Sequence, residues 1–294
     1  MVPPPLSAPL ALRLVAARTG GPEAFRRPEA QRSPAAGPRR DSAGGTARPS
    51  ARRQNPAASD SADADDTGRI VHATLIDVDG RRWERRLVRT HVIRPGEDIV
   101  ETVARYALPY VRSGDVVFVG QKAASISQGR LVRERSVRPR RLATFLSHHV
   151  KRTPFGRGLG RPATMEIALR EAGVPRILLA AAVHLVARSL GRSGDFYRVA
   201  GRRVASIDGV TDWALPPFNQ YIVLHPTDAH GLARRIAARL GAPAAVVDLN
   251  DLGGEVLGYS PGVDPRLLVR VLADNPLGQG PFRTPLGLAR PLDP

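Results

Sequence analysis

The spacing of apolar residues divides the chain near residue 69. Residues 1–68 show no sustained helical or strand period, and Ala, Pro, Arg, Ser and Gly dominate them. Such a segment cannot bury enough apolar surface to offset the entropy that it loses on ordering. We therefore expect a disordered tail over 1–68, for which a transit peptide is the alternative, and a folded domain over 69–294.

Period-two patterning marks the start of the folded domain. The segments IVHATLIDV and WERRLVRTHVI predict two strands joined at Asp79-Gly80, a dipeptide that favours a tight hairpin turn. Pro95-Gly96 then breaks the chain, and the acidic residues that follow start a predicted helix running to about Ala107. The β-branched run DVVFVG predicts a buried strand.

The rest of the chain alternates between helical and strand patterns. Its longest apolar run, ILLAAAVHLVA, is about half the length of a membrane-spanning helix and is interrupted by His184, so it predicts a buried core helix. The interleaving predicts an α+β fold in which helices flank a mixed sheet. We expect helices over 141–150, 163–172, 175–190 and 230–241, and strands over 204–208, 220–225 and 244–251.

Composition excludes some kinds of chemistry. The chain has no cysteine, so disulfides, thiolate metal sites and a cysteine nucleophile are ruled out. A net charge of +17 is typical of proteins that bind nucleic acid. However, Lys122 and Lys151 are the only lysines, the arginines are scattered, and no nucleic-acid-binding motif is present. We expect a soluble, cytoplasmic protein that binds neither nucleic acid nor a membrane.

Two acidic residues follow β-branched runs and precede turns. Asp208 lies in VASIDG and Asp248 in AVVDLND, so each carboxylate is expected at a strand end, where α/β proteins often bind ligands. Two such carboxylates meeting in space would hold a Mg²⁺ ion that bridges nucleotide phosphates. The alternative is purely structural, with a turn at Asp208-Gly209 and a helix cap at Asp248.

A basic, glycine-rich loop follows the helix predicted over 141–150. Its glycines would let backbone N–H groups approach an anion, and its cations would add charge. A phosphate cradle is one interpretation and a flexible surface loop is the other, because the loop matches neither a Walker nor a dinucleotide-binding motif. The residues predicted to bind phosphate are Lys151, Arg152, Thr153, Gly156, Gly158 and Gly160.

Other candidate motifs are weak. His148 and His149 lack metal-ligand spacing, and we expect them, like His184, to serve packing or surface roles. No GxSxG nucleophile elbow is present, so the sequence assigns no catalytic residue. Near the C-terminus, flanking glycines could bring the amide of Gln279 close to a ligand, although a surface turn would have the same pattern.

Four segments together resemble the coenzyme F420-0:L-glutamate ligase family, over about residues 69–290. They occur in the family's order with compatible spacing, and they are closest to a divergent bacterial branch. VRSGDVVFVGQKAASISQGRLV is similar to an early strand-turn segment, in which a Ser-containing turn ends in Gly-Arg. VASID is similar to the motif NAGID, AVVDLND to ITDTNG, and LGQG followed by RTPLG to a segment near the C-terminus.

The resemblance implies a homodimer that uses GTP and Mg²⁺ or Mn²⁺ to join L-glutamate to coenzyme F420-0 or a related carboxylate. GTP would phosphorylate the carboxylate, and the amine of glutamate would attack the acyl phosphate. By motif, Asp208, Asp248 and Gln279 would be metal ligands. We also assign Ser125 and Asn250, which lie in the matched segments, to nucleotide binding.

Two other functions remain open at this point. A ligase of the same fold could join a different amine to a different acid. A non-catalytic protein could keep the fold and bind a nucleotide or a coenzyme without turnover.

Overall fold

The computed structural model describes residues 67–150, 158–189, 191, 195–250, 253–278 and 280–292. All of them belong to one of the two units into which contacts divide the chain, Ala57–Pro294. The tail predicted over 1–68 therefore lies outside the described residues, apart from Thr67 and Gly68.

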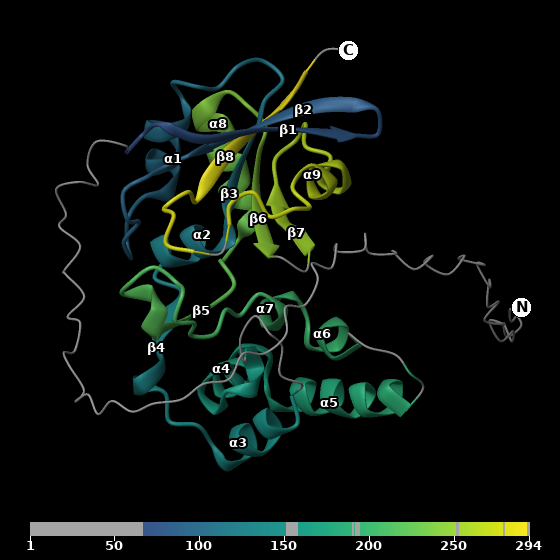
Figure 1. Ribbon diagram of the computed structural model, residues 1–294. Coiled ribbons are helices and arrows are strands. Elements are labelled where there is room, and N and C mark those ends of the chain that lie inside the picture. The colour runs from purple at the N-terminus through teal and green to yellow at the C-terminus, as the bar shows by residue number, and fades with distance from the viewer. Residues whose placement is uncertain are drawn as a thin grey trace, which may run out of the picture. The chain divides into compact units, whose positions relative to one another are not determined.

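Six strands of the described residues form a mixed sheet in the order β1-β2-β8-β3-β6-β7 (Figure 1). The neighbours β3 and β6 are parallel, whereas the other neighbouring pairs are antiparallel. The carboxyl ends of β3 and β6 therefore lie side by side. The strands are β1 (Ile70–Val78), β2 (Arg81–Val88), β3 (Val116–Gly120), β6 (Ala244–Asn250), β7 (Gly253–Tyr259) and β8 (Leu286–Pro291), with a separate pair, β4 (Leu131–Arg133) and β5 (Tyr221–Val223).

The hairpin and the helix predicted at the start of the domain are confirmed. Strands β1 and β2 are joined by Asp79 and Gly80, whose φ values of 53° and 75° suit a tight turn that matches the twist of the strands. The helix α1 (Ile99–Ala107) begins at Asp98, whose carboxylate accepts hydrogen bonds from the N–H groups of the first turn.

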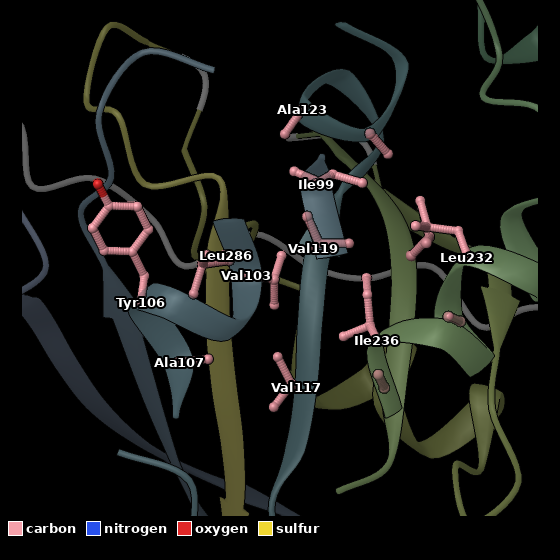
Figure 2. Close-up of a cluster of buried hydrophobic side chains, with 14 of the residues drawn as sticks. Ile99, Val103, Tyr106, Ala107, Val117, Val119, Ala123, Leu232, Ile236 and Leu286 are labelled. Carbon is pink, nitrogen blue, oxygen red and sulfur yellow. The ribbon is translucent and has the colours of Figure 1, made fainter. Parts of the chain in front are cut away.

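Helices cover both faces of the sheet. Helices α1 and α8 (Ala229–Leu240) pack on one face and α9 (Pro265–Val271) packs on the other. Alternation along β3 puts Val117 and Val119 into the α1 side, where Figure 2 shows them among residues of α1 and α8, and puts Phe118 into the α9 side. In β6 the same alternation puts Val246 on the α1 side, and continuing it by two residues brings Asp248 to that side.

A second apolar core lies among helices that follow β4. It holds buried residues of α4 and α5 together with Ile222 of β5. The sheet with flanking helices confirms the predicted α+β fold. The helices in this part are α3 (Arg141–His148), α4 (Pro162–Ala172), α5 (Val174–Ser189), α6 (Asp195–Ala200) and α7 (Arg202–Ala205), with 3-10 turns η1 (Glu134–Ser136), η2 (Gly158–Gly160) and η3 (Phe218–Gln220).

Two local predictions are wrong. Residues 204–208 do not form a strand, because Gly201, with a φ of 93°, ends α6 and the chain re-enters a helix as α7. Asp208 then makes an isolated bridge to Val223. The Ser-containing turn expected after β3 is mostly the helix α2 (Gln121–Ser127), because its apolar residues reach the core on the α1 side of the sheet.

The apolar run in α5 is a helix, as predicted, but not a buried one. Ile177, Ala180 and Ala187 are buried, on the one side of the helix that the described residues cover. Among the described residues, no single helix is long and apolar enough to cross a membrane, and α4 and α5 pass that test only as a pair bent by 113°. The exposed large apolar residues of α5 are Leu178, Leu179, Leu185 and Val186.

Candidate metal and nucleotide site

A cavity of about 390 Å³ lies at the carboxyl ends of the parallel strands β3 and β6. This edge of a sheet is where α/β proteins commonly bind ligands. The walls come from segments that are far apart in sequence, namely 90–93, 120–126, 205–218, 247–250, 277–278 and 280–285, with Gly158. The fold therefore assembles the cavity, and no single motif contains it.

Backbone pairing holds Asp208 in the wall of this cavity. Its N–H donates to the carbonyl of Val223, and the N–H of Val223 donates back, each at 2.9 Å. The buried side chain of Gln121 fixes the same segment to α2, because its amide donates to the carbonyls of Ser206 (3.2 Å) and Leu224 (3.0 Å). Asp208 is thus anchored by backbone contacts on both sides.

The cavity brings together the two acids predicted as metal ligands. Both Asp208 and Asp248 line it. Burial raises the pKa of Asp248 to about 6, and the charge of Asp208 adds to the rise, against a hydrogen bond from Ser206 and the charge of Lys122. A carboxylate whose ionisation is disfavoured by desolvation and by a neighbouring carboxylate lies at a place that a cation would stabilise. Their role as metal ligands stays a prediction.

Sequence reasoning missed a cation in this cavity. The Nζ atom of Lys122 lies 3.3 Å from Oδ2 of Asp208 and 5.6 Å from the ring centroid of Trp213. The signal was present, because a lysine is rare in a chain whose other basic residues are almost all arginine. Trp213 itself carries no sequence signal, since its segment has no regular period.

The donor set fits a divalent cation that also binds phosphate. Among the described residues, no three His, Cys, Asp or Glu side chains form a metal-binding group. Glu255, which faces Asp248 across β6 and β7, is paired with Arg202 at 2.7 Å. Mg²⁺ commonly takes one or two carboxylates and completes its shell with water and substrate phosphates. Two carboxylates beside open space match that pattern.

The predicted phosphate-binding residues fall into different places. Gly158 and Asn250 line the cavity, whereas Gly160 and Ser125 are not among its lining residues. Ser125 is fully buried, and its hydroxyl accepts a hydrogen bond from Gln121 at 3.2 Å. Lys151, Arg152, Thr153 and Gly156, and the predicted metal ligand Gln279, lie outside the described residues. The neighbours of Gln279, Gly278 and Gly280, do line the cavity.

A histidine that the sequence did not single out, His91, lies in the wall of the cavity. His148 and His149 are exposed on α3 and the residue after it, as expected. His91 lines the cavity, with Nε2 at 2.7 Å from Oε1 of Glu97 and Nδ1 at 2.8 Å from the hydroxyl of Tyr106. Since both ring nitrogens have partners, His91 shapes a wall of the cavity and is a poor candidate for a general base.

Comparison with known proteins shows a similarity to one protein family. A family model described as F420-0:Gamma-glutamyl ligase matches residues 87–247, which is more than half of the chain. The match begins near the end of β2, includes Lys122 and Asp208, and ends one residue before Asp248. No curated protein matches the chain.

Proposed function

Since the chain belongs to the F420-0:gamma-glutamyl ligase family, a family of ligases, we propose that it is a GTP- and metal-dependent ligase that joins L-glutamate to coenzyme F420-0 or a related carboxylate. The membership confirms the resemblance read from the sequence. We assign the activity to the domain of residues 69–294. The observation that carries the proposal is the meeting of Asp208, Asp248 and Lys122 in one cavity.

The side chains of this cavity suggest a division of tasks. Asp208 and Asp248 would hold Mg²⁺ or Mn²⁺, which when bound would offset phosphate charge and polarise the transferring group. Lys122 supplies a positive charge beside Asp208 and would contact a phosphate oxygen. Asn250 and Gly158, which line the same cavity, support the predicted nucleotide contacts.

The proposed reaction has two steps. An oxygen of the acid's carboxylate attacks the γ-phosphorus of GTP, GDP leaves, and an acyl phosphate forms. The amine of glutamate then attacks the acyl carbon and loses a proton, and phosphate leaves as the amide forms. The contribution of the protein to both steps is to position the reactants and to stabilise negative charge, which is what a cavity with fixed cations can do.

The direct test is to incubate the purified protein with GTP, Mn²⁺, L-glutamate and coenzyme F420-0 and to follow the mass of the coenzyme. We expect the addition of glutamate with release of GDP, and its loss in Asp248→Asn. Asp77→Asn is the matched control, because Asp77 is exposed on β1, and it should keep full activity. Turnover of GTP with other acids alone would favour a different substrate, and binding of GTP without turnover would favour a non-catalytic protein.

The exposed stripe on α5 supports the proposed homodimer. Its apolar residues are arranged symmetrically about Ala182, which is exposed, with members three and four positions away in each direction. Two copies of such a stripe can pack antiparallel around a two-fold axis at Ala182, where the small side chain permits close approach. The other members of the stripe are Leu178, Leu179, Leu185 and Val186.

Light scattering tests this assembly. We expect a dimer for the unaltered chain and a monomer for Leu185→Glu. Leu75→Glu, at a β1 position that is also exposed, is the control and should stay dimeric. A monomeric unaltered chain would contradict the proposed homodimer.

A further inference from the structure

The first turn of α4 is buried and has no cap. Arg161, the residue before the helix, makes no capping hydrogen bond through its side chain, and Pro162 begins the helix without an N–H group. Ala163 and Thr164, the next two residues, are 8% and 0% exposed. Within the described part of the chain, no group accepts a hydrogen bond from the backbone N–H of either residue. Buried helix starts normally have such partners.

The side chain of Thr164 adds a second unsatisfied group. Its hydroxyl oxygen is buried and has no hydrogen-bond partner. A buried hydroxyl without a partner disfavours folding, because the group has lost water and gained nothing in exchange. Three donors, two from the backbone and one from this side chain, are therefore present in one turn of α4. Such a turn also carries the positive end of the helix dipole.

Two glycines separate this turn from the cavity. Gly158 and Gly209 both line the cavity. A Cβ atom on Gly209 would lie 3.4 Å from the hydroxyl oxygen of Thr164 and 3.5 Å from the Cα atom of Gly158. A side chain at position 209 would thus lie against the Thr164 hydroxyl. With glycine there, no side chain stands between this hydroxyl and the wall of the cavity that Gly209 forms.

We infer that the first turn of α4, with the hydroxyl of Thr164, binds an oxyanion group of a ligand in the cavity, reached past Gly209. The inference rests on the proposed function for the identity of the ligand. A phosphate of the nucleotide suits the position best, because Gly209 directly follows the candidate metal ligand Asp208 and a phosphate can contact a metal and a helix start together. A carboxylate of glutamate has the same chemistry.

An ion pair holds the residue before α4. The glycine-rich loop leads directly into α4, and Arg161, at its end, pairs with Glu134 through Nη1 at 2.9 Å. That ion pair holds the residue before the helix in place and leaves the helix start facing the two glycines.

The test measures binding, not turnover, in Thr164→Val, which keeps the shape of the side chain and removes its hydroxyl. Because the hydroxyl has no partner in the free protein, we expect Thr164→Val to unfold at the same denaturant concentration as the unaltered chain, or a higher one. Calorimetry should show GTP binding weakened about tenfold in Thr164→Val, which corresponds to one charge-assisted hydrogen bond. Thr164→Ser should retain most of the affinity, and Thr144→Val, on the exposed side of α3, is the control.

Three probes separate the sources of the oxyanion and the possible failures. Weakened binding of GTP or of inorganic phosphate assigns the site to a phosphate, and weakened binding of glutamate alone assigns it to a carboxylate. Equal affinity of Thr164→Val and the unaltered chain for all three probes overturns the inference and leaves the proposed function standing. An unaltered chain that binds none of the three overturns both.

Discussion

Two aspartates near opposite ends of strand β3 have opposite electrostatic surroundings. Asp115, just before β3, is fully buried and accepts hydrogen bonds from Nε and Nη2 of Arg290 at 2.7 and 2.8 Å. The backbone N–H of Arg112 adds a third. Near the other end of β3, Asp248 of the neighbouring strand β6 is half-buried beside a second carboxylate, and desolvation is the main cause of the rise of its pKa to about 6.

This contrast distinguishes a structural carboxylate from a candidate functional one. At Asp115 the protein supplies the counter-charge, and the hydrogen bond to Asp115 raises the pKa of Arg290 in return. At Asp248 the nearby cation, Lys122, is paired with Asp208. A charge that the chain itself leaves poorly compensated favours a ligand that brings the missing cation.

The largest expected effect is on the free energy of unfolding, when Asp115 loses its counter-charge. Arg290→Met would leave the carboxylate of Asp115 buried without its counter-charge, and we expect a loss of about 3–5 kcal/mol in the free energy of unfolding. Urea denaturation measures it. Nucleotide affinity should not change. The double variant Asp115→Leu with Arg290→Met, which removes both charges, should recover most of the loss, and a loss below about 1 kcal/mol in the single variant would contradict the comparison.

Removing the charge of Asp248, which has no such counter-charge, should instead increase the stability of the folded protein. The pKa of Asp248 is raised from 3.8 to about 6, so the folded state resists ionisation as pH rises through this window, and the penalty is complete above it. Asp248→Asn removes the penalty and should stabilise the ligand-free protein by about 1–3 kcal/mol at pH 8. The gain should shrink as the pH falls from 6 toward 3.8 and disappear below about pH 3, where the carboxyl is protonated in both states. Unfolding curves at several pH values give the profile, and a variant less stable than the unaltered chain at pH 8 would refute this reading.

The smallest expected effect concerns the cation in the cavity. Lys122→Met should weaken GTP binding about tenfold, equivalent to about 1.4 kcal/mol, because a positive charge beside the phosphates is lost. Lys122→Arg, which keeps the charge, should bind more tightly than Lys122→Met. Fluorescence-monitored titration provides the affinities. Equal affinity in all three proteins would remove Lys122 from the site.

The sequence predicted what depends on local pattern. The hairpin at Asp79-Gly80 and the helix that runs to Ala107 follow from neighbouring residues, and both predictions are confirmed. The two acids that the sequence singled out, Asp208 and Asp248, both line the cavity, and their role as metal ligands stays a prediction. Asp208 was expected at the end of a strand, whereas the structure places it on an isolated β-bridge.

What the sequence did not reveal depends on distant contacts. Strand β8 inserts between β2 and β3, and no local pattern specifies such a partner. The exposure of α5 could not be read from a run that is apolar on all sides, because the number of neighbours decides which face is covered. The closeness of Gly209 to the Thr164 hydroxyl likewise depends on the fold, because the two residues are far apart in sequence.

Calorimetric titration with Mn²⁺ tests the central claim most directly, namely that Asp208 and Asp248 together bind a divalent ion that a nucleotide also contacts. We expect the unaltered chain and Asp77→Asn to bind Mn²⁺ more tightly when GDP is present, and Asp208→Asn and Asp248→Asn to lose that binding while remaining folded. Absence of Mn²⁺ binding by the unaltered chain, with or without nucleotide, or unchanged binding by Asp248→Asn, would contradict the account.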